Sequence, residues 1–375
     1  MNWNKVKFKK FITLQRGFDL PISEMKDGEI PVLGSTGIIG YHNKAKVNSP
    51  GVVTGRSGTI GLVQYADRPY WPHNTSLWVN NFKGNNPKFI YYKLQTLKLN
   101  RFKRGASVPT LNRNNLDNLL VQIPDIPIQD KIASTLSTYD GLINTNRRRI
   151  QLLEEAARFL FREWFVHFRF PGYEKEKIVD GVPEGWKVAK VKDLGQIVTG
   201  KTPSKKNMRN FNGNVPFIKT PDMHQSWIIL NTEETLSETG ASSQNNKHLP
   251  PWSVLVSCIG TVGVVAMNLF KSQTNQQINS VIPKNKFYRY YSFFCLLNIK
   301  PLLEAIGGGS TMANINKNKF ENIKINIPAE NVLVKFQQTV DPIFNQIALL
   351  LDQNQKLAQA QNLLLPRLMS GIIEV

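Results

Sequence analysis

Apolar residues recur every three to four positions along residues 127–165, and this spacing predicts one long helix. Its a and d heptad positions are Ile132, Leu136, Tyr139, Ile143, Asn146, Ile150, Leu153, Ala157, Leu160 and Trp164. Nine of these ten residues are apolar or aromatic, which is typical of a coiled-coil seam. At ~1.5 Å per residue such a helix is nearly 60 Å long, so we expect it to pair with another helix.

The same pattern returns 204 residues later and predicts a second long helix over residues 332–369. Its seam positions are Phe336, Val340, Ile343, Ile347, Leu350, Asn354, Leu357, Gln361, Leu364 and Leu368. Eight of the ten are apolar, and we expect Asn146 and Asn354 to fix the register as polar intrusions. Pro342 predicts a kink near the start of this helix. Two unrelated amphipathic helices are the alternative.

The flanking sequence also repeats, which favours a duplication. Residues 105–124, GASVPTLNRNNLDNLLVQIP, match residues 309–328, GSTMANINKNKFENIKINIP, without a gap. Residues 49–61 match 251–263, with Gly58 opposite Gly260, and Trp3 matches Trp186 near the two domain starts. The chain therefore reads as two copies of a globular domain, each followed by a long helix.

Short β-branched and aromatic runs between Gly, Pro and Asn dominate each globular part, so we expect an α+β fold. Its architecture is two pseudo-symmetric, mostly β domains separated by two long antiparallel helices that form an intramolecular coiled coil. The expected boundaries are a first domain at 1–125, a central helical region at 126–172, a linker at 173–185, a second domain at 186–330 and a C-terminal helical region at 331–375.

Charge indicates the kind of partner. The 47 Lys and Arg residues against 27 Asp and Glu give a net charge of +20, which points to a polyanion, and to nucleic acid before membrane. The only two cysteines, Cys258 and Cys295, support neither a disulfide framework nor a zinc site and fit a reducing cytoplasm. The uncharged stretch from Leu249 to Phe270 contains two prolines and two glycines, so we expect two buried strands there and no transmembrane helix.

Two copies of one domain are able to read two separated short DNA sequences. Half-site centres one helical turn apart, ~34 Å, are the natural spacing for such a body. Because the loops of the two copies differ, the half-sites should differ in sequence.

The run over residues 126–165 resembles the central helical region of specificity subunits of type I restriction-modification enzymes. The matching positions are Pro127, Gln129, Lys131, Ile132, Ala133, Leu136, Asp140, Ile143, Ile150, Leu153, Leu160, Phe161, Trp164 and Phe165. Residues 182–204 are similar to the opening of a target recognition domain in that family, and TNQQINS at 274–280 also recurs there. The first domain departs from this pattern, with QRGFDLP at 15–21 in place of TGKTPS.

The resemblance implies a non-catalytic subunit that reads a bipartite, asymmetric site on double-stranded DNA. In the family, two methyltransferase (modification) subunits assemble on the helical regions, and restriction/translocase subunits add to that core. S-adenosylmethionine and ATP are then expected only on the partner subunits, with no cofactor, metal or catalytic residue in this chain.

Polar and basic residues in the loops are the candidates for DNA contact, because Lys and Arg neutralise phosphates and Asn, Gln, Arg, Ser and Thr read base edges. The candidates are Arg56, Ser57, His73, Asn74, Arg104 and Thr110 in the first domain, and Lys201, Lys205, Lys219, His224, Gln276 and Gln277 in the second. An ordinary surface loop is the alternative interpretation for each residue alone.

Two other function classes remain open. One is a stand-alone two-domain DNA-binding protein, such as a repressor or an architectural protein. The other is a P-loop enzyme, since residues 195–202, GQIVTGKT, satisfy GxxxxGK[ST]. A P-loop leads directly into a helix, whereas Pro203 and an Asn-rich polar run follow here, so we expect Lys201 to meet a DNA phosphate instead.

Overall fold

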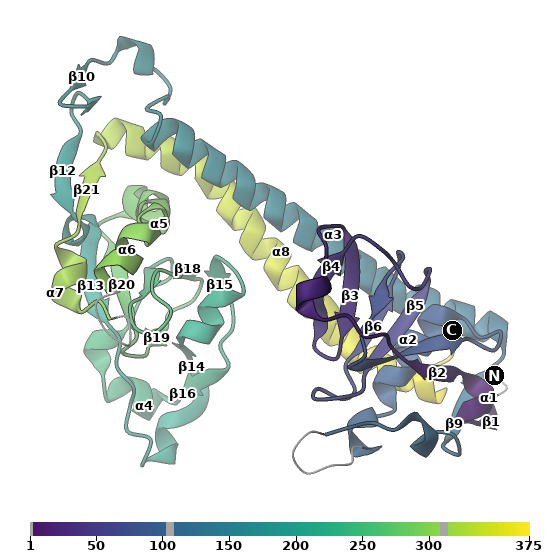
Figure 1. The fold of residues 1–375 in the computed structure, drawn as a ribbon. Helices are drawn as coiled ribbons and strands as arrows, with labels where there is room; N and C mark the ends of the chain where they lie inside the picture. Colours follow the sequence, from purple (N-terminus) through teal and green to yellow (C-terminus); the bar gives the residue numbers. More distant parts are fainter. Residues whose placement is uncertain (1–2, 103–108, 308–313) are drawn as a thin grey trace. The chain divides into compact units, whose positions relative to one another are not determined.

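The computed structural model describes residues 3–102, 109–307 and 314–375. These residues form two compact units. Unit 1 comprises residues 1–144 and 355–375, and unit 2 comprises residues 145–354. Two long helices, α3 (Ile126–Phe165) and α8 (Glu330–Ser370), each contribute a segment to both units (Figure 1).

Unit 1 is built from three small sheets with the strand orders β2-β8-β5-β6, β4-β3-β7 and β1-β9. Its strands are β1 (Trp3–Lys7), β2 (Thr13–Arg16), β3 (Ile30–Gly34), β4 (Gly37–His42), β5 (Gly51–Gly55), β6 (Val63–Ala66), β7 (Trp71–Pro72), β8 (Ser76–Asn81) and β9 (Leu120–Pro124). Its short helices are α1 (Phe8–Phe11), η1 (Ile22–Glu24), α2 (Pro87–Thr96), η2 (Leu99–Phe102) and η3 (Arg113–Asn115).

Unit 2 contains sheets with the orders β13-β20-β17-β18-β15, β16-β14-β19, β12-β21 and β10-β11. Its strands are β10 (Ile178–Val179), β11 (Val182–Pro183), β12 (Lys187–Lys190), β13 (Gly195–Thr199), β14 (Phe211–Ile218), β15 (Ile228–Ile229), β16 (Glu234–Leu236), β17 (Val254–Ser257), β18 (Val265–Asn268), β19 (Gln273–Thr274), β20 (Ile278–Pro283) and β21 (Lys324–Ile327). Its short helices are η4 (Tyr173–Lys175), η5 (Val191–Leu194), η6 (Met208–Asn210), η7 (Thr220–His224), α4 (Glu238–Ser242), η8 (Asn245–Lys247), η9 (Lys286–Tyr288), α5 (Arg289–Asn298), α6 (Lys300–Gly307) and α7 (Lys317–Glu321).

The strand pairings repeat between the units. The antiparallel ribbon β1-β9 has its counterpart in β12-β21, and the parallel pair β3-β7 has its counterpart in β14-β19. The isolated bridge between Ser57 and Thr110 recurs between Ile259 and Asn314. The expected fold class, an α+β chain of two similar, mostly β domains with two long helices, is therefore confirmed.

The two long helices run antiparallel inside each unit. In unit 1 the side chain of Gln361 on α8 donates a hydrogen bond to the carbonyl oxygen of Leu136 on α3, at 3.2 Å. In unit 2 the ring of Trp164 on α3 lies 5.6 Å from the ring of Phe336 on α8. The helices begin and end within two residues of the ranges expected from the sequence.

Most of the expected seam residues are buried. Those below 9% exposure are Ile132, Leu136, Ile143, Asn146, Ile150, Ala157, Trp164, Phe336, Val340, Ile347, Leu350 and Leu368. The other eight seam residues, at intermediate exposure, are Tyr139, Leu153, Leu160, Ile343, Asn354, Leu357, Gln361 and Leu364. Phe344 is also buried, although it lies outside the seam and the heptad pattern does not predict its burial. Its ring faces the globular part of unit 2 and lies 4.3 Å from the ring of Tyr290.

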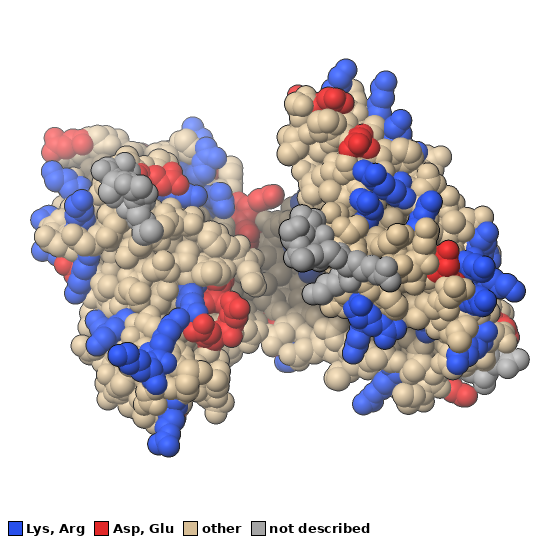
Figure 2. Space-filling model, turned by 60° about the horizontal axis from the view of Figure 1, so that its bottom comes forward, with Lys and Arg blue, Asp and Glu red and all other residues tan. Residues whose placement is uncertain are grey.

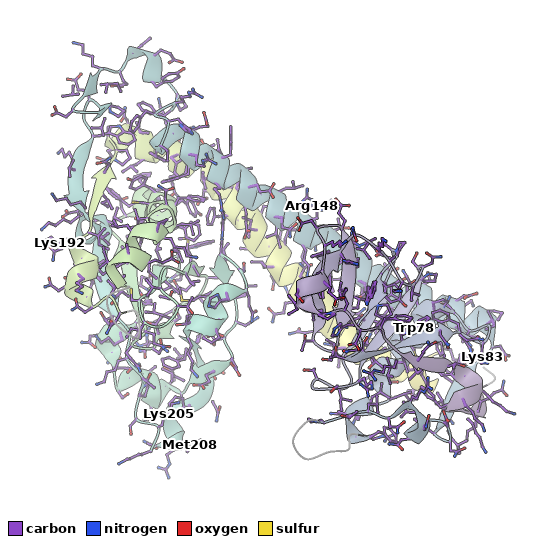
Figure 3. The ribbon with its side chains drawn as sticks, in the orientation of Figure 1. Trp78, Lys83, Arg148, Lys192, Lys205 and Met208 are labelled. Carbon is purple, nitrogen blue, oxygen red and sulfur yellow. The ribbon has the colours of Figure 1, made fainter. Side chains whose placement is uncertain are left out.

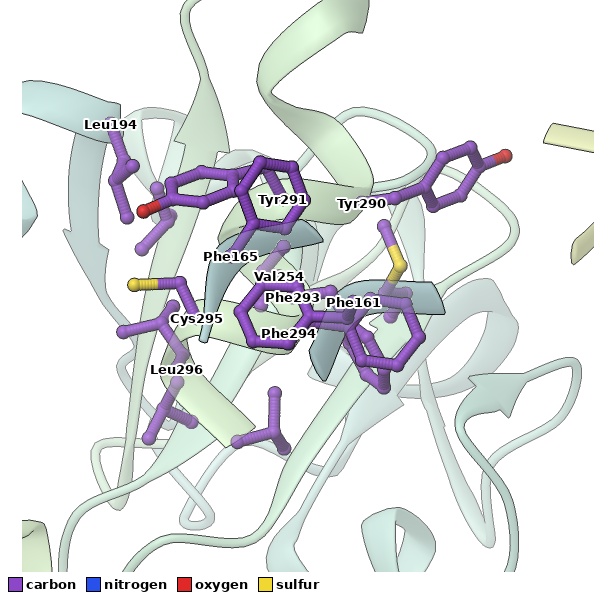
Figure 4. Packing of buried hydrophobic residues seen from close by; sticks show 14 of the residues in the cluster. Phe161, Phe165, Leu194, Val254, Tyr290, Tyr291, Phe293, Phe294, Cys295 and Leu296 are labelled. Carbon is purple, nitrogen blue, oxygen red and sulfur yellow. The ribbon is translucent and has the colours of Figure 1, made fainter. Parts of the chain in front are cut away.

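An aromatic cluster joins the end of α3 to the core of unit 2 (Figure 4). The ring of Phe161 stacks 5.4 Å from that of Phe294, and the ring of Phe165 lies 4.7 Å from that of Phe336. In contrast, Phe159 points away from this core and is 63% exposed. The aromatic residues that exceed the needs of the seam therefore serve mainly to attach the helix to the domain.

The uncharged stretch Leu249–Phe270 forms the antiparallel strands β17 and β18. Gly260 and Gly263 lie between them with φ of +77° and +82°, a backbone region that glycine enters without steric cost. Among the helices of the described residues, none combines the length and the apolarity that a bilayer crossing requires. Cys258 and Cys295 are both buried and unpaired with one another.

Candidate nucleic-acid interface

A glycine at the same place in each unit allows two loops to touch. A Cβ on Gly17, just after β2, would lie 2.1 Å from the carbonyl oxygen of His73. A Cβ on Gly200, just after β13, would lie 2.1 Å from the carbonyl oxygen of Asn275. These contacts hold the loop that follows β2 or β13 against the loop that precedes β8 or β20. The candidate site of each unit is built on this contact.

In unit 1 the backbone brings three loops together around Arg56. The amide N–H groups of Arg56 and Ser57 donate to the carbonyl oxygen of Thr75, at 2.9 and 3.1 Å. Ser57 also forms a bridge with Thr110, and the guanidinium of Arg56 donates to the carbonyl oxygen of Asn74 at 3.3 Å. Four candidates from distant parts of the sequence therefore lie in one place.

The charge of this site is more concentrated than the sequence predicts. Burial, and then the neighbouring positive charge of Arg16, lower the pKa of Arg56 from its usual value. The positive charges of Arg16 and Arg56 repel one another, and an anion bound beside them would offset this repulsion. Arg16 therefore belongs to the candidate site, although the sequence analysis did not select it. The only feature of the sequence that indicated Arg16 was its position directly before Gly17.

His73 and Asn74 are held by hydrogen bonds within the same loop region. The Nδ1 atom of His73 lies 2.9 Å from the hydroxyl of Thr75, and the side-chain amide of Asn74 donates to the carboxylate of Asp19. The side chains are half-buried, so each keeps a fixed orientation while one edge faces solvent. Arg104, the sixth candidate of this domain, lies outside the described residues.

In unit 2 the equivalent loop carries Gln276 and Gln277. The hydroxyl of Thr202 donates to Oε1 of Gln276 at 2.7 Å, which links this loop to the one that contains Lys201. The amide of Asn275 donates to Oε1 of Gln277 at 2.9 Å. Both bonds use the carbonyl oxygen of the glutamine and leave its NH₂ group for an acceptor such as a base edge.

The loop over residues 201–210 forms a basic tip on unit 2. Lys201 and Lys205 are exposed, as are Lys206 and Arg209, which sequence reasoning did not single out. Asn210 holds the loop closed, because its amide donates to the carbonyl oxygen of Ser204 at 3.0 Å. The absence of acidic residues between Asp193 and Asp222 was the sequence signal for this tip.

The remaining two candidates adjoin this region in different ways. The ammonium group of Lys219 forms an ion pair with Glu234, which balances part of its charge, and the backbone N–H of Lys219 donates to Asp222 at 2.8 Å. His224 ends the short helix η7 with an exposed side chain. Lys219 therefore contributes more to the shape of the loop than to its free charge.

The P-loop pattern at 195–202 does not have the geometry of a nucleotide site. Residues Gly195–Thr199 form strand β13, and the first helical element after them in the described chain is the three-residue turn η6 at Met208–Asn210. A P-loop needs a helix whose N-terminus points at the phosphates directly after the motif.

Groups of basic side chains are scattered over the face of each unit that is visible in Figure 2, with fewer carboxylates among them. Together with the net charge of +20, this gives each unit a surface suited to a polyanion. Amides and a histidine lie beside these charges in both units, which is the mixture that reads base edges next to a phosphate backbone.

Comparison with known proteins gives the family. The model of the type I restriction modification DNA specificity domain matches residues 1–155 and 183–359. The chain is 31% identical to the specificity subunit of the type I restriction enzyme HindI of Haemophilus influenzae, over 76% of this chain and 77% of that protein. It is 23% identical to the MjaIX specificity subunit of Methanocaldococcus jannaschii, over 84% of this chain and 76% of that protein.

Solved structures agree at the level of the fold. The crystal structure of a type I restriction-modification S subunit from M. genitalium covers 98% of this chain and 96% of its own, with a TM-score of 0.63 and 15% sequence identity. The repeated strand pairings, the paired loops of each unit and the match of the family model over most of the chain lead to one conclusion. The chain belongs to the family of type I restriction-modification DNA specificity proteins.

Proposed function

We propose that this chain is the sequence-specific DNA recognition subunit of a type I restriction-modification complex. The observation that carries the proposal is the recurrence of one loop arrangement in both units with different side chains. The loop that presents His73 and Asn74 in unit 1 presents Asn275 and Gln276 in unit 2. Each unit then reads its own half-site, and the whole site is bipartite and asymmetric.

Phosphate contacts and base contacts divide between the residue types. Arg16 and Arg56 in unit 1, and Lys201 and Lys205 in unit 2, neutralise phosphates and give an affinity that falls with salt. The side-chain amides of Asn74, Gln276 and Gln277, with His73, then read base edges in the major groove, each good pair contributing about 1–3 kcal/mol of discrimination. Ser57 and Thr110 lie on the same surface and complete the set in unit 1.

The chain contributes recognition and assembly, and its partners contribute the chemistry. Two methyltransferase subunits bind the long helices, and restriction/translocase subunits add to that core, with S-adenosylmethionine and ATP on these partners. Exposed apolar side chains on the helices support this proposal, because a partner subunit that covered them would remove apolar surface from water. They are Leu142, Leu152, Phe159, Leu349 and Leu363, with exposures of 47–64%. The assembled complex works in the cytoplasm, where it meets host DNA.

We place the functional boundaries at 1–125 and 186–330 for the two recognition domains, with the helical regions 126–172 and 331–375 as the scaffold and 173–185 as the linker. The packing of Phe161 and Phe165 onto Phe294 and Phe336 supports a scaffold that is continuous with the second domain.

The test is co-expression with a methyltransferase subunit of the same system, followed by mapping of methylated bases in the host DNA. We expect N6-methyladenine in one bipartite motif with two different half-sites. Exchange of residues 1–125 for those of another specificity subunit should change only one half-site. A soluble protein that binds one DNA site alone and directs no methylation would instead support a stand-alone DNA-binding protein.

A further inference from the structure

One large apolar side chain projects from the basic tip of unit 2. Met208, the first residue of η6, is 70% exposed, although methionine is among the residue types most often buried. Figure 3 shows Met208 and Lys205 at the same end of unit 2, with their side chains directed away from the ribbon. A binding partner that covered this side chain would remove its apolar surface from water, which is favourable.

The backbone around Met208 is fixed by hydrogen bonds. Oδ1 of Asn207 accepts from the N–H of Arg209 at 3.2 Å, and the hydroxyl of Ser237 donates to the carbonyl oxygen of Arg209 at 2.6 Å. Gly240 in α4 lies so close that an added Cβ would meet the carbonyl oxygen of Asn210 at 2.0 Å. The turn is thus packed against α4, and it holds the side chain of Met208 outward.

The neighbours of Met208 are cations. Lys205, Lys206 and Arg209 lie within three residues of it and are exposed, and none of them takes part in the ion pairs formed between described residues. An apolar side chain with free cations on both sides matches the chemistry of a DNA groove, in which base edges lie between two rows of phosphates.

Unit 1 has an exposed apolar residue at the position that corresponds to Met208. Ile22 is the first residue of η1, which lies between β2 and β3 as η6 lies between β13 and β14, and it is 82% exposed. Around Ile22, however, residues 19–29 carry Asp19, Glu24, Asp27 and Glu29 against the single cation Lys26. The same structural position therefore has the opposite charge in the two units, so phosphates approach the tip of unit 2 and are repelled from that of unit 1.

We propose that Met208 is a specificity-determining residue that contacts the 5-methyl group of a thymine in the half-site read by unit 2. This inference rests on the proposed function. Lys205, Lys206 and Arg209 hold the phosphates on either side, and the flexible, polarisable thioether packs against the methyl group in the major groove. The contact removes the exposed apolar surface of Met208 from water and discriminates thymine from the other bases.

The experiment measures binding of the assembled specificity–methyltransferase complex to its mapped site and to unrelated DNA, over a range of salt concentrations. Met208→Ala should weaken binding to the site about tenfold and leave binding to unrelated DNA unchanged. The slope of log affinity against log salt concentration should also stay unchanged. Met208→Leu should restore most of the affinity. Lys205→Ala should weaken binding to both DNAs and reduce the steepness of this salt dependence by about 0.9.

Two matched controls locate the contact. Ile22→Ala removes an apolar side chain that is 82% exposed from the acidic tip, and this variant should bind like the wild type. Replacement of thymine by uracil, one position at a time in the half-site of unit 2, should weaken wild-type binding at one position and have no effect there on Met208→Ala.

The outcomes separate the two proposals. If Met208→Ala binds its site like the wild type, loses affinity equally on both DNAs, or is as sensitive to uracil as the wild type, the assigned contact is overturned while recognition by the chain stands. If the wild-type complex does not distinguish its mapped site from unrelated DNA, the proposed function itself fails.

Discussion

Gln361 donates a hydrogen bond to Asp140, with 2.8 Å between Nε2 and Oδ1, and this bond joins the two long helices inside unit 1. The same carboxylate accepts a hydrogen bond from the hydroxyl of Tyr92 on α2. One aspartate thus connects α3 to its helical partner and to the globular part of the unit. Burial, and then the hydrogen bond from Tyr92 to Asp140, raise the pKa of Tyr92 well above its usual value.

Tyr92→Phe should lower the free energy of unfolding by about 1.5–3 kcal/mol, because a hydrogen bond to a charged acceptor is lost inside a buried contact. The measurement is a urea titration followed by tryptophan fluorescence. Tyr173→Phe is the matched control, since Tyr173 is 42% exposed and should tolerate the change. Equal stability of the two variants would show that the hydrogen bond from Tyr92 to Asp140 does not stabilise the fold.

Phe336→Ala should destabilise unit 2 by about 3–5 kcal/mol, the usual cost of removing a fully buried phenylalanine. Phe336 has 0% exposure and touches the rings of Phe165 and Trp164, which come from the other long helix. Leu349→Ala on the same helix removes a side chain that is 49% exposed and should cost far less. Thermal unfolding of both variants compares them, and a similar loss in each would contradict the role of the aromatic cluster.

Gly200→Ala should impair recognition by unit 2 alone. The new methyl group would overlap the carbonyl oxygen of Asn275 and push apart the loops that carry Lys201 and Gln276. We expect methylation mapping to show relaxed or lost specificity in one half-site and an unchanged other half-site. The control is Gly141→Ala, where no atom lies within 4 Å of the added Cβ and a helical alanine should stabilise by about 0.5–1 kcal/mol.

Lys93 gives unit 1 a stability that depends on alkaline pH. Its ammonium group is buried, donates to the carbonyl oxygen of Met369 at 2.8 Å, and has its pKa lowered by burial from 10.5 to about 8. Between pH 8 and 10.5 the unfolded chain therefore holds more protons at this site than the folded chain, so the free energy of unfolding rises with pH.

Lys93→Met should abolish this dependence. The difference in unfolding free energy between wild type and variant should then shift in favour of the wild type as the pH rises from 8 to 10. Tyrosines titrate in both proteins and cancel in the difference. A difference that stays constant over this range would show that Lys93 titrates normally.

The helices were predictable because their signal is long and periodic. Ten seam positions repeat in each helix, so that one exception, such as Asn146, does not obscure the pattern. The mostly β character of both domains was also predictable, and the duplication placed Gly58 opposite Gly260, which both have a positive φ in the structure.

The candidate site was only partly predictable, because its residues meet through loops. Arg56 and Asn74 are far apart in the sequence, and only the folded backbone shows that one side chain bonds the other residue. The pairing of Lys219 with Glu234 and the exposure of Met208 are likewise properties of the folded loops. The sequence indicates which types of residue are candidates for DNA contact. The orientation of their side chains depends on contacts between distant loops, which no periodic pattern in the sequence predicts.

The burial of both cysteines has a practical consequence for labelling. Burial raises the pKa of Cys258 to about 11 and that of Cys295 to about 12, so at neutral pH both sulfurs remain thiols that react slowly with alkylating reagents. A cysteine introduced at an exposed position, for example by Lys205→Cys, would then be the fast-reacting group of the native protein. Fluorophores, spin labels and photo-crosslinkers can therefore be attached to the loops that we propose contact DNA, without first replacing the natural cysteines.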